Sequence, residues 1–133
     1  MRLAALLLLV FSALGTEVEP QPLAIKLGLW ELHRIRNYDG RQDVRQECLI
    51  NDPTDPFQII RRGERKVRKS TRTVLEVDTD FHGPEAGRFG NLRIEVLDSE
   101  NVKASRQLRG WYVYGNSPDL SYTFAGKLDR PQL

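Results

Sequence analysis

The chain contains a single cysteine and only two histidines among its 133 residues. Cys48 has no internal partner, so an oxidising compartment cannot give this chain an intramolecular disulfide. Stability must then come from a packed core, unless two chains pair through Cys48. Also missing are a glycine-rich phosphate loop, a paired-cysteine metal motif, a G-x-S-x-G turn and an H-E-x-x-H motif. We therefore predict a protein that is not an enzyme and that needs no metal or cofactor.

Neither sign of charge dominates, because 20 Lys and Arg residues stand against 18 Asp and Glu residues. The formal net charge of +2 identifies no partner. A long hydrophobic run is also missing after the first fifteen residues, so we predict no transmembrane segment in the mature protein.

The N-terminus has the three parts of an export signal. Arg2 is the only charge in residues 1–15, an apolar run follows it over residues 3–11, and a small-residue stretch follows over residues 12–15. We expect cleavage between Gly15 and Thr16 and a periplasmic or secreted protein, with an uncleaved N-terminal anchor as the alternative. Residues 16–22 are then a flexible leader and residues 23–133 a single domain. Export makes nucleic acid an unexpected partner.

The first part of the domain has the pattern of a β-hairpin. Leu29 and Ile35 share one parity, Asp39-Gly40 follows, and Val44 and Cys48 share one parity again. A two-residue turn at Asp39-Gly40 places Ile35 opposite Val44. A four-residue loop would shift the partners along the strand without changing their faces. We predict that this aliphatic parity forms the buried face.

Residues 55–63 have the signals of a short helix. Asp55 suits its N-cap, Pro56 its first position and Gly63 its end. Phe57 and Ile60 would lie on one side of this helix and plug one end of a curved sheet.

The remaining sequence alternates between apolar and polar residues, as a half-buried sheet does. We predict strands over residues 67–81, 92–96, 102–114 and 120–128, separated by turns rich in Gly, Pro, Asn and Asp. The fold class is mainly β: a curved antiparallel sheet of about six strands with one short helix, either an open half-barrel or a small closed barrel.

Short motifs carry a resemblance to a known family. The segments Gly28-Leu29-Trp30-Glu31, Cys48-Leu49 and Asp55-Pro56-Phe57 resemble an exported bacterial family known as domain of unknown function 3617. That resemblance implies a small periplasmic β-protein and brings no catalytic residue. Family members usually contain more cysteines, so a family disulfide is out of reach here. The G-x-W string Gly28-Leu29-Trp30 is also similar to the first strand of lipocalin- and avidin-like ligand-binding barrels.

Three groups of side chains are candidate sites. An aromatic and aliphatic set of strand residues predicts a pocket for an apolar or ring-shaped ligand, with plain core filling as the alternative; its members are Trp30, Leu75, Val77, Tyr112, Tyr114, Tyr122 and Phe124.

A polar set, Glu31, His33 and Cys48, shares one hairpin face. It allows a metal-binding protein or a hydrolase as an alternative function. The plain interpretation is a buried cysteine beside two solvated side chains.

A basic patch follows the predicted helix, and it allows an alternative function as a module that binds an acidic protein or an anionic envelope component. Its members are Arg61, Arg62, Arg65, Lys66, Arg68, Lys69 and Arg72. A solvated edge that balances the acidic residues is the plain interpretation. Our first hypothesis is a non-catalytic, exported, small-ligand-binding or envelope-associated domain whose ligand and partner the sequence leaves unknown.

Overall fold

The computed structural model describes residues 18–81, 88–110 and 119–132, and this part of the chain forms one antiparallel sheet without a helix. Its seven strands are β1 (Gly28–Arg36), β2 (Gln42–Cys48), β3 (Glu64–Ser70), β4 (Val74–Asp80), β5 (Arg88–Asp98), β6 (Asn101–Gly110) and β7 (Leu120–Pro131). Within these ranges no helix has the length and apolarity needed to cross a membrane.

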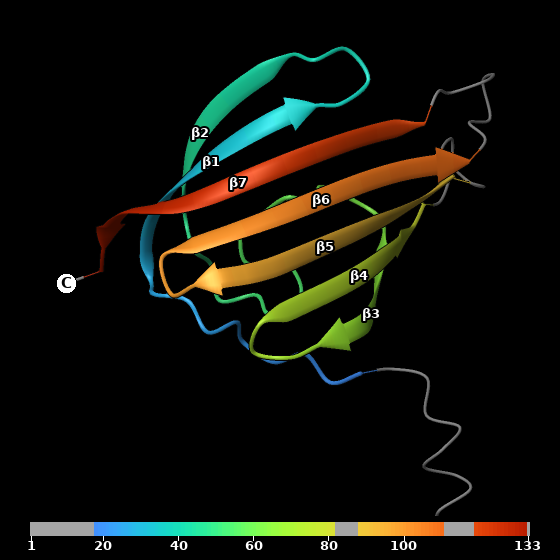
Figure 1. The fold of residues 1–133 in the computed structure, drawn as a ribbon. Helices are drawn as coiled ribbons and strands as arrows, with labels where there is room; N and C mark the ends of the chain where they lie inside the picture. Colours follow the sequence, from blue (N-terminus) through green and yellow to red (C-terminus); the bar gives the residue numbers. More distant parts are fainter. Residues whose placement is uncertain (1–17, 82–87, 111–118, 133) are drawn as a thin grey trace, which may run out of the picture.

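The strand order is β2-β1-β7-β6-β5-β4-β3, so the first strand pairs with the last and the sheet curves (Figure 1). The edge strands β2 and β3 do not pair with each other in the described ranges, so the sheet stays open. The mainly β, antiparallel prediction is confirmed, and its open alternative agrees with the structure. The closed alternative does not.

The predicted strand over residues 67–81 is in fact two strands joined by a tight turn. The Thr71 hydroxyl accepts hydrogen bonds from the backbone N–H groups of Thr73 and Val74, at 3.3 and 3.0 Å, which is the way a threonine stabilises a reversal. Val67 then faces Val77 across the pair, so both remain on the inner side. The alternation therefore survives the turn, which is why the sequence pattern alone predicted six strands instead of seven.

The first hairpin has a longer loop than the two-residue turn. Ile35 pairs with Gln42 rather than with Val44, and Leu29 pairs with Cys48. The Arg36 N–H donates to the Arg41 carbonyl at 2.8 Å, which closes a four-residue loop over residues 37–40. Each residue of β1 therefore pairs with a β2 residue two positions earlier than the two-residue turn predicts. Because this shift is even, the same side chains still share a face.

The prediction of which hairpin face is buried was wrong. Trp30 and Leu32 have essentially no exposed area, whereas Glu31 and His33 are exposed and Ile35 is 37% exposed. The larger apolar surface of the Trp30 side decides the choice, because burying an indole and a leucine removes more apolar area from water than burying the smaller side chains of the other parity.

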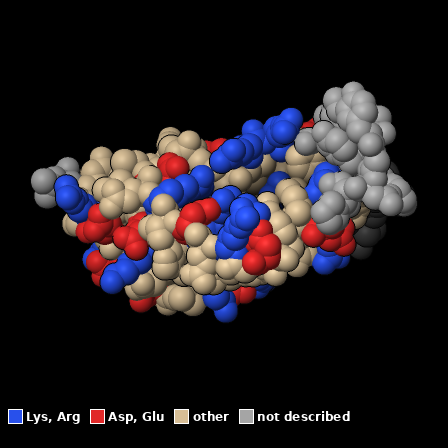
Figure 2. Space-filling model, turned by 90° about the horizontal axis from the view of Figure 1, so that it is seen from above, with Lys and Arg blue, Asp and Glu red and all other residues tan. Residues whose placement is uncertain are grey.

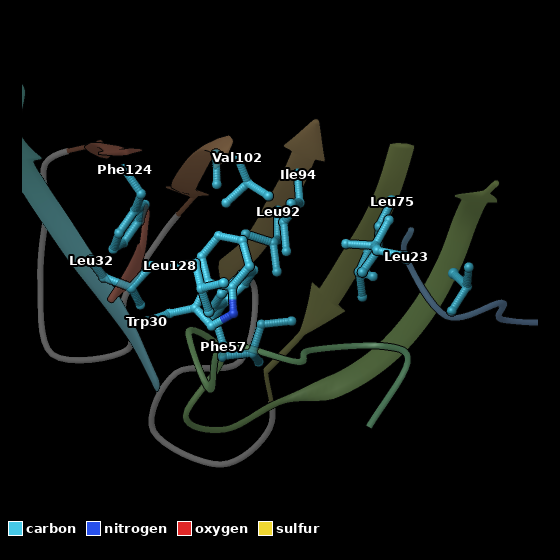
Figure 3. Close-up of a cluster of buried hydrophobic side chains, with 14 residues drawn as sticks. Leu23, Trp30, Leu32, Phe57, Leu75, Leu92, Ile94, Val102, Phe124 and Leu128 are labelled. Atoms are coloured by element: carbon cyan, nitrogen blue, oxygen red, sulfur yellow. The ribbon is translucent and has the colours of Figure 1, made fainter. Parts of the chain in front are cut away.

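The core fills the concave side of the sheet (Figure 3). Trp30 lies at its centre and packs edge-on against Phe57, with ring centroids 5.3 Å apart. The Trp30 indole N–H donates to the Lys26 carbonyl at 3.0 Å, so its one polar atom is satisfied. Every strand except β2 contributes, and the buried apolar residues are Leu23, Trp30, Leu32, Phe57, Ile60, Val67, Leu75, Val77, Leu92, Ile94, Val102, Ala104, Phe124 and Leu128.

The connection from β2 to β3 covers this concave side, and it is not a helix as predicted (Figure 1). Asp55 does cap backbone groups, but its carboxylate accepts from the N–H groups of Ile59 and Ile60, one or two residues beyond the reach of a helix N-cap. Gln58 has a φ of 56°, and this left-handed residue ends the helical path after one turn. Phe57 and Ile60 are nevertheless buried, as expected.

The segment before β1 closes one end of the sheet. The Ala24 N–H donates to the Arg72 carbonyl and the Lys26 N–H donates to the Ser99 carbonyl, at 2.7 and 2.8 Å. Leu23 is buried against the core between these two ties. The segment from about residue 21 onward is therefore held by hydrogen bonds to the turn between β3 and β4 and to the turn between β5 and β6.

Candidate functional site

A half-open pocket of about 380 Å³ lies between the concave side of the sheet and the β2–β3 connection. It is placed near the end of the sheet where β1, β4 and β6 finish and β7 begins. The lining residues are Arg34, Ile59, Arg61, Arg62, Phe81, Arg106, Leu108, Tyr122 and Phe124. A hollow of about 270 Å³ adjoins it and shares Arg34, Ile59, Arg61 and Phe124. We call the larger one the arginine pocket.

Part of the arginine pocket wall is apolar and aromatic. Phe124 and Tyr122 come from the inner face of β7, Leu108 from β6 and Phe81 from the residue after β4. Tyr122 is held by an edge-on contact with Tyr38, with ring centroids 5.8 Å apart. Such walls bind the apolar part of a small molecule.

The predicted pocket residues are separated by the structure. Tyr122 and Phe124 line the arginine pocket, whereas Trp30, Leu75 and Val77 are fully buried in the core and reach no solvent. Tyr112 and Tyr114 lie outside the described residues. The expected cavity beside Leu75 and Val77 is therefore filled by core packing instead.

Arg106 is the inner end of the arginine pocket. It points inward from β6 and is 5% exposed. Its Nη2 donates to the Thr79 hydroxyl at 3.0 Å, and its Nη1 is buried without a hydrogen-bond partner. Burial lowers the pKa of Arg106 to about 10, partly opposed by the Asp55 carboxylate, so the side chain is still a cation at neutral pH.

Asp55 is a carboxylate whose charge acts on Arg106, and it is already engaged. Its two carboxylate oxygens accept from the N–H groups of Ile59 and Ile60 at 2.8 and 2.7 Å, and the Arg65 guanidinium is 3.9 Å away. Burial raises the pKa of Asp55 despite these bonds. Arg106 therefore has no carboxylate of its own among the described residues.

The mouth of the pocket is basic. Arg34 forms an ion pair with Asp43 and places its guanidinium 5.4 Å from the centroid of the Tyr122 ring. Arg61 is exposed and makes no ion pair with a described residue. The lining contains four arginines and, within the described ranges, no carboxylate. The electrostatic potential in the pocket is therefore positive.

Gly90 leaves room for the Arg106 side chain. A methyl group at Gly90 would come within 2.6 Å of the Thr79 hydroxyl oxygen and 2.8 Å of Arg106 Nη1. We expect Gly90→Ala to displace the guanidinium and to lower the free energy of unfolding by about 1–3 kcal/mol, as overpacking does. Chemical denaturation measures this loss.

Ser105→Ala is the control for Gly90→Ala, because Ser105 lies on β6 beside Arg106 with its side chain on the opposite face. We expect this control to change the free energy of unfolding by less than about 0.5 kcal/mol. Equal stability of Gly90→Ala and the wild type would mean that the guanidinium is not confined as described.

The predicted basic patch is divided by the fold. Arg61 and Arg62 line the arginine pocket, and Arg65 bonds to Asp52 and to Thr54, at 2.6 and 2.9 Å. Arg68 forms an ion pair with Asp78 at 2.5 Å, and Lys66, Lys69 and Arg72 belong to β3 or to the turn after it. Two members therefore neutralise acids of the same molecule, as the plain interpretation expected.

The predicted polar set does share one face, but that face is the outer one. Glu31, His33 and Cys48 are all exposed, with Cys48 a free thiol at the end of β2. In the described residues, no group of three or more His, Cys, Asp or Glu side chains is placed to hold a metal ion. His82 lies outside the described residues.

The side of the molecule that is seen from above in Figure 2 has mixed charge. Seen from above in Figure 2, acidic and basic side chains are interspersed, and neither sign covers that side of the molecule. A hollow of about 460 Å³ on the outer face contains the Arg68–Asp78 pair and an Asn91–Asp78 hydrogen bond of 2.9 Å. This hollow therefore contains carboxylates as well as cations, whereas the described lining of the arginine pocket contains cations alone.

Sequence reasoning missed Arg106, Thr79 and Arg34 as members of a site. The available signal was parity: Arg106 continues the inner-face positions of Val102 and Ala104, so a cation occupies an apolar register. A charged residue on a buried parity is either paired or functional.

Comparisons of the chain with models of known protein families, with curated proteins and with solved structures found no match. The site is therefore interpreted from its own geometry.

Proposed function

We propose that this protein is a non-catalytic, exported binding protein that holds a small amphipathic molecule in the arginine pocket. One observation carries the proposal: aromatic and aliphatic walls and a buried guanidinium converge on the same half-open space of about 380 Å³. Sites for small molecules combine such walls with a few polar groups that fix orientation, and their volumes start at about 300 Å³. The signal-like N-terminus supports export.

The fold suits a binding role because the pocket stands on packed elements. Phe124 and Arg106 come from paired neighbouring strands, and the β2–β3 connection opposite them is anchored by buried Phe57 and Ile60. Walls held in this way are largely formed before a ligand arrives, which reduces the ordering cost of binding. The polar set on the outer hairpin face offers no comparable enclosure.

Binding of the uncharged fluorescent probe N-phenyl-1-naphthylamine tests the proposal. We expect a saturable rise in its emission with the wild-type protein, because the probe transfers its rings to an apolar wall. Leu108→Trp places a larger side chain on the pocket wall and is expected to weaken binding at least about tenfold by occupying the space.

Leu97→Trp is the matched control, since Leu97 is 60% exposed and lies outside the pocket. It should bind the probe as the wild type does. Absence of saturable binding by the wild type, or equal binding by Leu108→Trp and the wild type, would overturn the proposed function.

A further inference from the structure

We infer that the arginine pocket selects a ligand with a single carboxylate head, which the Arg106 guanidinium receives at the inner end of the pocket while the aromatic walls hold the apolar body. This inference rests on the proposed function and adds the chemical class of the ligand. It starts from the unpartnered atom, Arg106 Nη1, which is buried without a hydrogen bond.

A buried guanidinium with an unused donor is costly. Removing a charged group from water costs several kcal/mol unless an opposite charge or hydrogen bonds compensate for it. Arg106 has only one such bond, from Nη2 to Thr79. An incoming carboxylate would supply both the missing charge and the missing acceptor, and charge-assisted bonds of this kind are stronger than neutral ones.

The described residues do not supply that carboxylate. Asp55 is occupied by two backbone N–H groups and lies close to Arg65. Asp43 is occupied by Arg34 at the mouth of the pocket. Arg61 is exposed there without an ion pair to a described residue, so the entrance attracts anions and the inner end retains one.

A carboxylate fits better than a phosphate because the inner end of the pocket offers few hydrogen-bond donors. Among the described residues Arg106 makes one hydrogen bond, from Nη2 to Thr79, and the apolar part of the lining includes Leu108, Phe124 and Phe81. A phosphate dianion would bring a second charge and more acceptor atoms to the inner end, where Arg106 is the one buried cation among the described lining residues. The pocket volume of about 380 Å³ accommodates an apolar body of about two or three aromatic rings.

Three probes with the same body separate these classes: 2-naphthoate, 2-naphthamide and 2-naphthyl phosphate. Isothermal titration calorimetry of the full chain should show 2-naphthoate binding at least about tenfold more tightly than 2-naphthamide, since a hydrogen bond to a charged group contributes more than 1.4 kcal/mol. The phosphate should bind more weakly than the carboxylate. This comparison uses the wild type alone, so it does not depend on any variant folding.

The variant Arg106→Gln tests whether Arg106 causes the preference for 2-naphthoate over 2-naphthamide. We expect this variant to bind 2-naphthamide as the wild type does and to lose its tenfold preference for 2-naphthoate. Arg109→Gln is the matched control, because Arg109 is exposed on β6 and outside the arginine pocket. It should keep the preference. The preference should also persist at high salt, because a buried pair is screened much less than an exposed one.

The outcomes distinguish the two proposals. Equal binding of 2-naphthoate and 2-naphthamide by the wild type overturns the carboxylate assignment and leaves the proposed function standing. Binding of 2-naphthyl phosphate that is tighter than binding of 2-naphthoate overturns the choice of head group. Loss of the preference for 2-naphthoate in Arg109→Gln or at high salt would show that Arg106 is not its cause. Failure of all three probes and of N-phenyl-1-naphthylamine overturns both proposals.

Discussion

Replacing Phe57 with alanine is expected to lower the free energy of unfolding by about 3–5 kcal/mol, the usual cost of removing a buried phenyl ring. Phe57 has no exposed area and packs edge-on against Trp30, so its loss leaves a cavity at the centre of the core. The same residue fixes the β2–β3 connection on the sheet. Urea unfolding followed by far-ultraviolet circular dichroism measures the loss.

Phe89→Ala provides the control with the same chemical change. Phe89 lies on the outer face of β5 and is 52% exposed, so the alanine variant should lose less than about 1 kcal/mol. Similar losses for Phe57→Ala and Phe89→Ala would contradict the placement of Phe57 in the core. A large loss confined to Phe57→Ala would support a connection that is part of the core rather than a surface loop.

Replacing Asp55 with asparagine is expected to cost about 2–4 kcal/mol at pH 7, because an amide has one oxygen where the carboxylate has two. Asp55 accepts from the N–H groups of Ile59 and Ile60, and in the variant one of these buried donors would face the amide N–H₂ group instead. Asp43→Asn changes an acid at the mouth of the arginine pocket and should cost less than about 1 kcal/mol.

The stability difference between the wild type and Asp55→Asn should depend on pH in a defined direction. Burial raises the pKa of folded Asp55 above its ordinary value of 3.8. At pH values between 3.8 and the raised pKa of folded Asp55, the folded state binds more protons than the unfolded state. The contribution of Asp55 to the free energy of unfolding therefore falls as pH rises through this window. The difference should therefore be largest near pH 4, smaller once the folded pKa is passed, and constant above it.

Urea unfolding of both proteins at pH 4, 5 and 7 checks this dependence. Acids with a lowered pKa, such as Asp52 and Asp78, act in the opposite direction, but they are present in both proteins and largely cancel in the difference. A difference that narrows toward pH 4 would show that the hydrogen bonds to Ile59 and Ile60 outweigh burial at Asp55.

The hairpin shows where sequence patterns stop being sufficient. Period-two alternation correctly grouped Glu31, His33 and Cys48 on one face, because the side-chain period of a strand is local geometry. It did not determine which face meets the core. That choice depended on Phe57, from the distant β2–β3 connection, packing on Trp30.

The predicted helix failed for a similar reason. Asp55, Pro56 and Gly63 are correct local signals for a helix, but they act within a few residues, whereas the burial of Phe57 and Ile60 depends on the whole concave side. The connection follows the shape of the core, with Gln58 in a left-handed conformation, and Asp55 caps the resulting turn instead of a helix. Tertiary packing overrode local propensity here.

The candidate site was recognised from sequence only in part. Aromatic residues on an inner parity indicated Tyr122 and Phe124, and the basic run indicated Arg61 and Arg62, yet nothing local joined the two groups. Arg106 was the missing member, because its burial arises from strand order and from the space above Gly90.

By itself the sequence determined a mainly β, antiparallel domain with an apolar inner side, because alternation and turn chemistry act within a few residues. Only the tertiary structure decided which hairpin face is buried, how residues 49–63 cover the sheet and why Arg106 stands at the end of a pocket. These features arise from contacts between residues far apart in the chain, and their energies depend on the apolar area and the charge that such contacts remove from water.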